Sequence, residues 1–306
     1  MRSWLEQPKL VSVRDKIITS LTPKNYRFRR MAPVVFICGG MDSEPRDTLR
    51  TYLSREHPTV NVFYAERVWD IISSNPGLGA LKMESDLAAL SDLVVIIVES
   101  PGTFAELGAF SHVDDLRKKL LPIVDIKYRA ANSFINTGPI RWIDQESEFK
   151  PSIWVPLDQI LLSSRDIDRR IQSIPRPMPS KISNLAANRK HLLFFVCDLV
   201  AVIAPASISM IEYFLERIIP SAPLQELEVP LLVGLAEAMG LLRKDVVGTD
   251  LLGERTFFSP ADPDSLASPF HRVKWVDLAS LRSEYVSKLQ VIPEAIKTMR
   301  EVTSGL

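Results

Sequence analysis

The stretch from Asp92 to Phe110, DLVVIIVESPGTFAELGAF, constrains the fold of this chain more than any other. It contains an unbroken apolar run, Leu93 to Val98, which has the length of a buried strand. A tight turn with a glycine and a helix-forming segment follow at once. A buried strand that turns directly into a helix is the repeating unit of an open parallel α/β sheet. Ligands of such sheets bind where strands end and helices begin, so the stretch also predicts where function lies.

Glu106 is the first candidate functional residue, because it lies about one turn into the predicted helix. Its carboxylate can face a ligand bound at the strand-to-helix turn. It can equally complement the positive N-terminal end of the helix, as acidic residues often do. The turn adds the hydroxyl groups of Ser100 and Thr103, and Gly102 lies between them. Asp92, in contrast, is expected to start the strand and to have a structural role.

Strands and helices alternate along residues 31–160, which predicts an α/β domain with a Rossmann-like, doubly wound parallel sheet. The first strand ends in Gly39, Gly40, Met41 and Asp42. Two glycines at such a turn let a ligand approach the backbone, although the spacing matches neither the G-x-G-x-x-G fingerprint nor a Walker loop. The expected strands are 34–38, 60–64, 93–98, 120–125 and an edge strand at 153–155.

The bulk composition excludes several classes of protein. The 306 residues suffice for two domains, and a formal net charge of zero gives no overall attraction to nucleic acid or membrane. Two distant cysteines, Cys38 and Cys197, do not make a disulfide framework, which fits a reducing cytosol. No apolar run reaches the roughly 18 residues of a membrane-spanning helix. We therefore expect a soluble, cytoplasmic protein.

Carboxylate chemistry remains after the common alternatives are excluded. A catalytic serine triad is not expected, because the chain lacks a G-x-S-x-G elbow. No bound metal is expected, since no histidines pair at ligand spacing; the four are His57, His112, His191 and His271. Cleavage of a glycosidic bond needs a carboxylate close to the anomeric carbon of a sugar. The sequence thus favours carboxylate chemistry on a sugar-like substrate.

Two basic segments flank the predicted α/β domain. Residues 1–30 carry eight Lys or Arg against two acidic residues, and their apolar spacing predicts an amphipathic helix. This helix can contact phosphates or an acidic partner, or it can lie as a solvated helix on the sheet. Residues 161–190 combine basic residues with prolines, which predicts a semi-rigid linker. The residues expected to contact a nucleic acid or a partner are Arg29, Arg30, Arg169, Arg170 and Lys181.

Residues 191–306 are predicted to form a second, mainly helical domain that resembles a winged helix. Arg243, Lys244 and Arg255 would lie near the wing. The modest density of basic residues leaves DNA binding and docking to another protein both open. The expected elements are helices at 191–203, 207–219 and 230–242 and β-prone segments at 246–250 and 255–258.

Four motifs carry a resemblance to a known family: FICGG (36–40), VFYAE (62–66), ESPGTFAELGAFS (99–111) and SFINTGPIR (133–141). The chain resembles the retron effectors with a nucleoside 2-deoxyribosyltransferase-like domain, the type II retron systems of bacterial antiphage defence. About the first 150 residues carry the resemblance, and the C-terminal half fits only in outline. The resemblance implies a Rossmann-like fold and an N-glycosidase activity.

The resemblance also implies roles for single residues. Glu106 matches the glutamate that attacks the anomeric carbon, and Glu84 matches an acidic residue that contacts the sugar hydroxyls. Most deoxyribosyltransferases have Asp at the Glu84 position. They often place a second Asp where this chain has Ser100, a departure that argues against base transfer. Asn136 lies where some relatives lend an asparagine to a neighbouring subunit. The implied substrate-binding residues are Gly39, Gly40, Asp42, Tyr64, Ser100, Gly102, Thr103 and Asn136.

The implied activity is that of a toxin that hydrolyses NAD+ at the nicotinamide–ribose bond. NAD+ would be a substrate, and no cofactor is expected. The implied partners are the retron reverse transcriptase and its multicopy single-stranded DNA, which restrain the toxin in an oligomer or filament until infection. Two alternatives stay open: a nucleoside or nucleotide deoxyribosyltransferase or nucleotide hydrolase, and a non-catalytic module that binds nucleic acid or a nucleotide.

Overall fold

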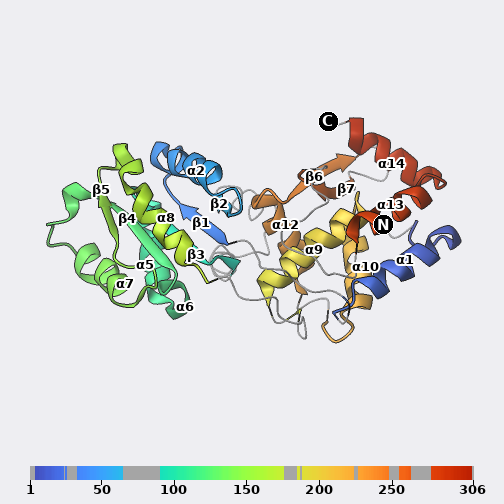
Figure 1. Ribbon diagram of the computed structural model, residues 1–306, viewed down its shortest axis with the longest axis horizontal. Coiled ribbons are helices and arrows are strands. Elements are labelled where there is room, and N and C mark those ends of the chain that lie inside the picture. Colours follow the sequence, from blue (N-terminus) through green and yellow to red (C-terminus); the bar gives the residue numbers. More distant parts are fainter. Residues whose placement is uncertain are drawn as a thin grey trace. The chain divides into compact units, whose positions relative to one another are not determined.

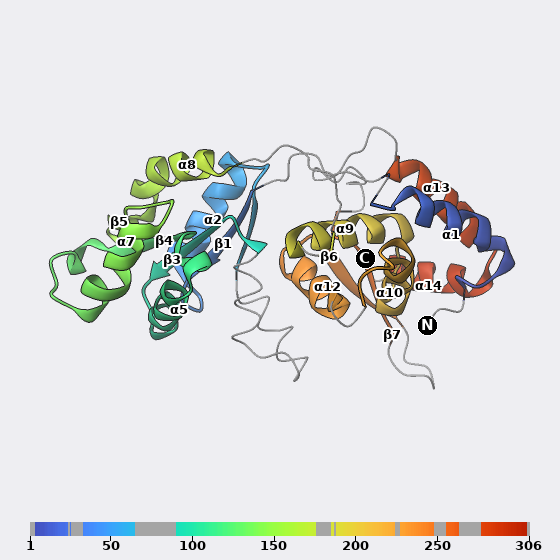
Figure 2. The same ribbon diagram turned by 90° about the horizontal axis from the view of Figure 1, so that it is seen from below.

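The chain divides into two compact units (Figures 1 and 2). Residues 32–176 form one unit, and residues 1–31 together with 177–306 form the other. The computed structural model describes residues 4–23, 25, 33–64, 90–175, 185–186, 188–223, 227–247, 255–262 and 277–304.

The unit of residues 32–176 is built on a five-stranded, wholly parallel sheet, which confirms the predicted α/β class. The strand order is β2-β1-β3-β4-β5, so the chain reverses its direction of travel across the sheet between β1 and β3. Ligands of doubly wound sheets bind beyond the carboxyl ends of the strands at such a reversal. The strands are β1 (Val34–Cys38), β2 (Asn61–Tyr64), β3 (Leu93–Val98), β4 (Leu120–Asp125) and β5 (Ile153–Val155).

Helices cover both faces of this sheet, and in Figure 2 α8 lies on one side of it and α5 on the other. Every residue of β1 and β3 is buried, as unbroken apolar runs require when both faces are covered. Along each strand alternate residues point to opposite faces, so Val35 and Ile37 pack toward α2 and α8. The helices are α2 (Glu44–Glu56), α5 (Pro101–His112), α6 (Asp114–Arg117), α7 (Arg141–Glu146) and α8 (Ser164–Ser173), with shorter helical turns η1 (Ile126–Tyr128), η2 (Asn136–Ile140) and η3 (Leu157–Ser163).

The linker predicted for residues 161–190 includes residues that the structure assigns to the helical segments η3 and α8. The structure places η3 and α8 against the sheet, where Ile167, Ile171 and Ile174 join the core. Their spacing puts the three isoleucines on one helix face, while charged side chains such as Arg169 occupy the other. The basic composition of this stretch therefore marks the outer face of an amphipathic helix that belongs to the α/β unit.

The other unit centres on α9, in which eleven of fifteen residues are buried. Helix α1 lies beside α13 in both views (Figures 1 and 2) and is joined to it by a hydrogen bond from Trp4 Nε1 to the hydroxyl of Tyr285. Helix α1 thus packs within this unit. The described helices are α1 (Pro8–Ser20), α9 (Arg189–Ile203), α10 (Ile208–Ile218), α12 (Val229–Ala238), α13 (Leu278–Leu289) and α14 (Pro293–Ser304).

An antiparallel hairpin of β6 (Leu242–Val247) and β7 (Arg255–Pro260) follows α9, α10 and α12, in the order that was predicted, and precedes α13. The helix expected at 230–242 ends sooner, at Ala238, because Gly240 adopts a left-handed conformation with φ 69°. The winged-helix assignment stays a prediction. Among the described residues, no helix has both the length and the apolar character needed to cross a membrane.

Candidate active site

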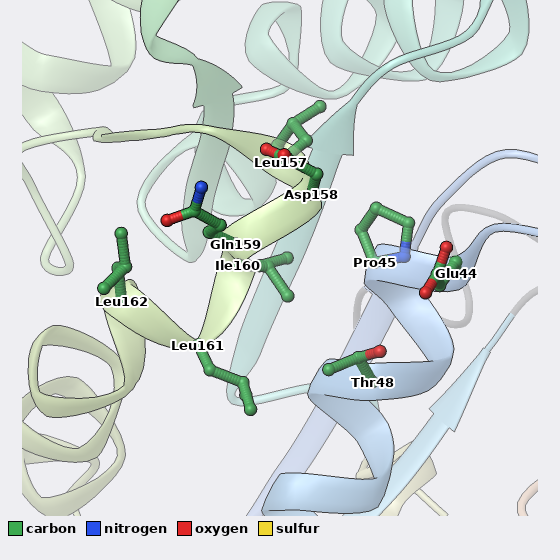
Figure 3. A pocket seen from close by; sticks show the side chains of 9 residues that line it. All are labelled: Glu44, Pro45, Thr48, Leu157, Asp158, Gln159, Ile160, Leu161 and Leu162. Carbon is green, nitrogen blue, oxygen red and sulfur yellow. The ribbon is translucent and has the colours of Figure 1, made fainter.

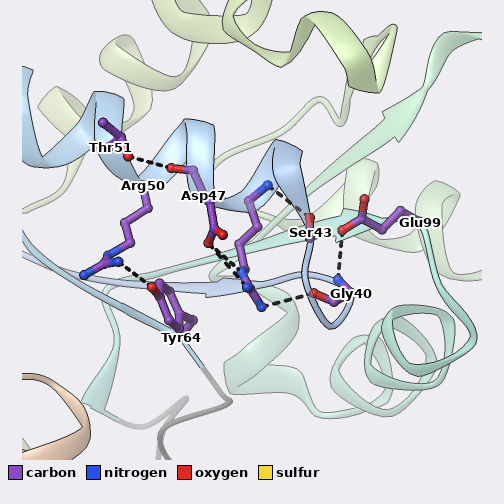
Figure 4. A network of polar contacts seen from close by, with 8 residues as sticks. Gly40, Ser43, Asp47, Arg50, Thr51, Tyr64 and Glu99 are labelled. Atoms are coloured by element: carbon purple, nitrogen blue, oxygen red, sulfur yellow. Dashed lines mark hydrogen bonds and ion pairs between the residues drawn. The ribbon is translucent and has the colours of Figure 1, made fainter.

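The loops that follow β1 and β3 meet where the strand order reverses. The backbone N–H of Gly40 donates a 2.8 Å hydrogen bond to Oε1 of Glu99, the first residue after β3 (Figure 4). The carbonyl oxygen of Gly40 accepts a 3.1 Å hydrogen bond from Nη1 of Arg46. Two charged side chains from different elements therefore hold both polar groups of one glycine, which gives this loop a defined shape.

Arg46 explains why the loop begins with glycine. Arg46 is 4% exposed, and its side chain packs directly against Gly39. A Cβ atom at Gly39 would lie 2.9 Å from Cβ of Arg46, which is closer than real Cβ contacts. Gly39, predicted as a substrate-binding residue, thus has a packing role. Asp42 is exposed and has φ 56°, the left-handed region that turns the chain toward α2.

The hydroxyl groups predicted to bind substrate close a capping box at the start of α5. Ser100 Oγ accepts from the backbone N–H of Thr103, and Thr103 Oγ1 accepts from the backbone N–H groups of Ser100 and Glu99. Thr103 is only 1% exposed. The Thr103 hydroxyl is therefore engaged by the backbone in the capping box, and its substrate-binding role stays a prediction. Gly102 and half-buried Ser100 remain at the surface of the turn.

Glu106 lies in the second turn of α5, with Thr103 and Phe110 three and four residues away on the buried face of the helix. It is half-buried, and its Oε2 atom is shielded from solvent. The stabilisation of carboxylates by a helix N-terminus falls off within the first turn. The position of Glu106 in the second turn therefore argues against charge complementation at the helix end, and its role toward a ligand stays a prediction.

Tyr64 ends β2 beside the same loop, and two arginines of α2 surround it. The guanidinium carbons of Arg46 and Arg50 each lie 4.8 Å from the centre of the Tyr64 ring. Arg50 also donates a hydrogen bond to the Tyr64 hydroxyl, as Figure 4 shows. Tyr64 was predicted from the sequence as a substrate-binding residue, and the structure places it at the carboxyl edge of the sheet with Gly40.

Other predicted residues have structural contacts. Asp92 accepts a 2.8 Å hydrogen bond from the N–H of Val34, which joins the starts of β3 and β1 and confirms its structural role. Asn136 donates from Nδ2 to the carbonyl oxygens of Tyr128 and Ala131, so its amide group braces its own loop.

The residues predicted to contact nucleic acid differ in their surroundings. Arg170 donates to the backbone carbonyl oxygens of Phe149 and Pro151, so it also has a structural role within the α/β unit, and its contact with a partner stays a prediction. Arg169 is exposed and pairs with Asp166. The remaining predicted residues lie outside the described part of the chain: Glu84, Arg29, Arg30 and Lys181.

Sequence reasoning missed three residues at this edge: Glu99, Arg46 and Arg50. Glu99 is a charged residue that directly ends a buried strand, and this position is a usable signal. The two arginines are four residues apart on the first helix after a Gly-Gly turn, so they share one helix face. Among the described residues, no three His, Cys, Asp or Glu side chains gather as a metal site would require.

A pocket of about 480 Å³ lies between the start of α2 and η3, and Figure 3 shows the side chains around it. Two carboxylates, Glu44 and Asp158, accompany mostly apolar side chains there. The residues that hold Gly40 are absent from its lining, so this pocket is distinct from the edge that carries Glu106. Its lining consists of Glu44, Pro45, Thr48, Leu157, Asp158, Gln159, Ile160, Leu161 and Leu162.

The fold and the site define an α/β protein with a Rossmann-like parallel sheet, in which α5 carries Glu106 just after the strand β3 at the reversal of strand order. Its sequence matches the model of the STM3845 retron effector protein over residues 42–244, and the chain belongs to that family. The match extends from the α/β unit into the second unit. It confirms the predicted retron effector, whereas the deoxyribosyltransferase-like subfamily stays a prediction.

Two proteins of Escherichia coli are similar to this chain. One is named "Retron Ec86 putative ribosyltransferase/DNA-binding protein" and is 34% identical over 174 residues, which cover 54% of this chain and 56% of the relative. The corresponding protein of retron Ec73, with the same description, is 37% identical over 122 residues, 37% of this chain and 39% of the relative. The chain thus spans about half or less of the length of these relatives.

Proposed function

We propose that this retron effector is an N-glycosidase of antiphage defence that hydrolyses NAD+ at the nicotinamide–ribose bond. The observation that carries the proposal is the position of Glu106, half-buried on α5 beside the edge where β1 and β3 reverse the strand order. Ligands bind at such an edge, and cleavage of a glycosidic bond needs one carboxylate beside the anomeric carbon. The description of the relatives as ribosyltransferases supports the same chemistry.

The proposed reaction needs little beyond this carboxylate. The bond between C1′ of the ribose and the nicotinamide nitrogen breaks, and its electron pair goes to the pyridinium ring, which leaves as neutral nicotinamide. The positive charge that develops at C1′ is stabilised by the carboxylate of Glu106, or Glu106 bonds to C1′. Water then adds its hydroxyl group to C1′ and releases one proton. The products are nicotinamide, ADP-ribose and a proton.

Replacement of Glu106 by Gln tests the assignment, since it removes the negative charge and keeps the size of the side chain. The purified chain should release nicotinamide from NAD+, and Glu106→Gln should reduce the rate by at least about 100-fold. Glu56→Gln, at an exposed carboxylate of α2, is the matched control and should keep full activity. Equal rates for Glu106→Gln and the wild type would remove Glu106 from the mechanism. Exchange of bases between deoxynucleosides would instead identify a deoxyribosyltransferase.

The proposal includes restraint by the retron reverse transcriptase and its multicopy single-stranded DNA. The relatives are described as DNA-binding, and β6 presents an exposed Lys244 on the hairpin of this chain. If Lys244 contacts a phosphate, Lys244→Ala weakens DNA binding at all sequences and lowers the slope of log K against log salt by about 1. A slope that stays unchanged would place the DNA elsewhere on the chain.

A further inference from the structure

Arg46 and Arg50 place two positive charges on one face of α2, next to the end of β2. They are one helical turn apart, and both guanidinium groups lie over the ring of Tyr64. Like charges four residues apart on a helix disfavour it. The two arginines thus place two guanidinium groups side by side at the end of β2.

The two arginines differ in what they contact. Arg46 is engaged by the protein: it donates to the carbonyl oxygen of Gly40 and pairs with Asp47 at 3.3 Å. Arg50 is half-buried, and within the described residues no carboxylate lies at ion-pair distance from it. Its hydrogen bond goes to the hydroxyl of Tyr64, which orients the guanidinium and leaves its remaining N–H groups for another acceptor. A planar guanidinium held in this way suits bidentate binding of phosphate.

The position of Arg50 relates it to the proposed reaction. β2 pairs with β1 and β1 pairs with β3, so two strand spacings, roughly 10 Å, separate β2 from β3 across the sheet, and the register places Tyr64 level with Ile37 and Val95. Gly40 lies between them and contacts both Arg46 and Glu99. A nucleotide that places its sugar near Glu106 can therefore extend along the sheet edge toward Arg50.

We propose that Arg50, oriented by Tyr64 and backed by Arg46, binds a phosphate group of the substrate, so that the site selects nucleotides over nucleosides. This inference rests on the proposed function, because it takes the ribose to lie at Glu106. It adds the chemical class of the substrate and the residue that recognises it. Arg46 is a positioning residue in this arrangement, since its contacts are with Gly40, Asp47 and Tyr64.

The test measures binding without turnover. Calorimetry on the full chain carrying Glu106→Gln compares NAD+ and nicotinamide mononucleotide with nicotinamide riboside, which has the same base and sugar and no phosphate. Arg50→Ala should lower the affinity for both nucleotides by at least tenfold and leave the affinity for the riboside unchanged. Arg50→Lys keeps the charge without the planar fork and should recover part of the loss. Tyr64→Phe should cause a smaller loss, because it removes only the group that orients Arg50.

Arg55 provides the control on the same helix, since it is exposed and pairs with Glu56. Arg55→Ala should bind every probe as the parent does, and thermal melts verify that each variant is folded. Inorganic phosphate alone should compete with the mononucleotide for binding to the parent chain. It should not compete for binding to the Arg50→Ala variant.

The outcomes separate this inference from the proposed function. Nucleotide binding that depends on Arg50, in a wild-type chain that releases no nicotinamide, supports the subsite and removes the reaction. Nicotinamide release with a KM that Arg50→Ala leaves unchanged overturns the subsite and keeps the reaction. Equal affinity for nicotinamide riboside and nicotinamide mononucleotide also overturns the subsite. The same holds if a single-stranded oligonucleotide binds in an Arg50-dependent way and the mononucleotide does not compete with it.

Discussion

The carboxylate of Glu99, the first residue after β3, accepts a 2.8 Å hydrogen bond from the backbone N–H of Gly40 in the loop after β1. This contact joins two segments that are about sixty residues apart in the sequence and brings the start of α5, with Glu106, to the Gly-Gly turn. The partner contact, from Arg46 to the carbonyl oxygen of Gly40, fixes the same peptide from the other side. The shape of the candidate site depends on this pair of charged contacts.

Glu99→Ala is expected to lower the free energy of unfolding by about 1–2 kcal/mol, because it leaves the Gly40 amide without its charged acceptor. Glu99→Gln keeps an oxygen acceptor and should lower the free energy of unfolding by less. Urea denaturation of the full chain measures both. Glu56→Ala, at an exposed carboxylate of α2, serves as the control and should stay within about 0.5 kcal/mol of the wild type. Equal losses for Glu99→Ala and the control would mean that the contact contributes nothing.

Gly39→Ala is expected to destabilise the chain by about 1–3 kcal/mol, since the new methyl group would lie 2.9 Å from Cβ of the buried Arg46. Gly108→Ala is the matched substitution. It lies inside α5 with no atom within 4 Å of the new Cβ, and it should stabilise the helix by about 0.5–1 kcal/mol. Thermal melts distinguish the two signs. A tolerated Gly39→Ala would show that Arg46 can shift without cost.

Stability should fall at alkaline pH through Tyr52, which joins α2 to α8 by donating a 2.8 Å hydrogen bond to Asp168. Burial and this hydrogen bond raise the pKa of Tyr52 above its ordinary value of 10.0. The folded state thus holds the phenolic proton more tightly than the unfolded state. The resulting stabilisation is complete below about pH 10 and is lost as the pH rises through the folded-state pKa.

Tyr52→Phe removes this titration, so the variant should be less stable than the wild type near pH 8 and the difference should shrink toward pH 11. Melting temperatures measured across this range provide the comparison. The same difference at every pH would indicate that Tyr52 contributes only packing.

The fold of the α/β unit was largely predictable, because its apolar runs and helix starts are encoded by neighbouring residues. The strands at 93–98 and 120–125 have the predicted bounds. The stretch 161–175 was misjudged, since its basic composition concealed the isoleucines that pack on the sheet. The capping box of Ser100 and Thr103 was also hidden, because the types of these residues suit a ligand and a helix start equally well.

The sequence by itself determined that a strand, a turn and a helix follow one another from Asp92 to Phe110, and that Glu106 lies just beyond the turn. Only the tertiary structure decided which loops meet there. The strand order β2-β1-β3 places Gly40 against Glu99 and Tyr64 beside Arg46 and Arg50. Local patterns arise from contacts within a few residues, whereas strand order arises from pairing between distant segments, which periodicity does not encode.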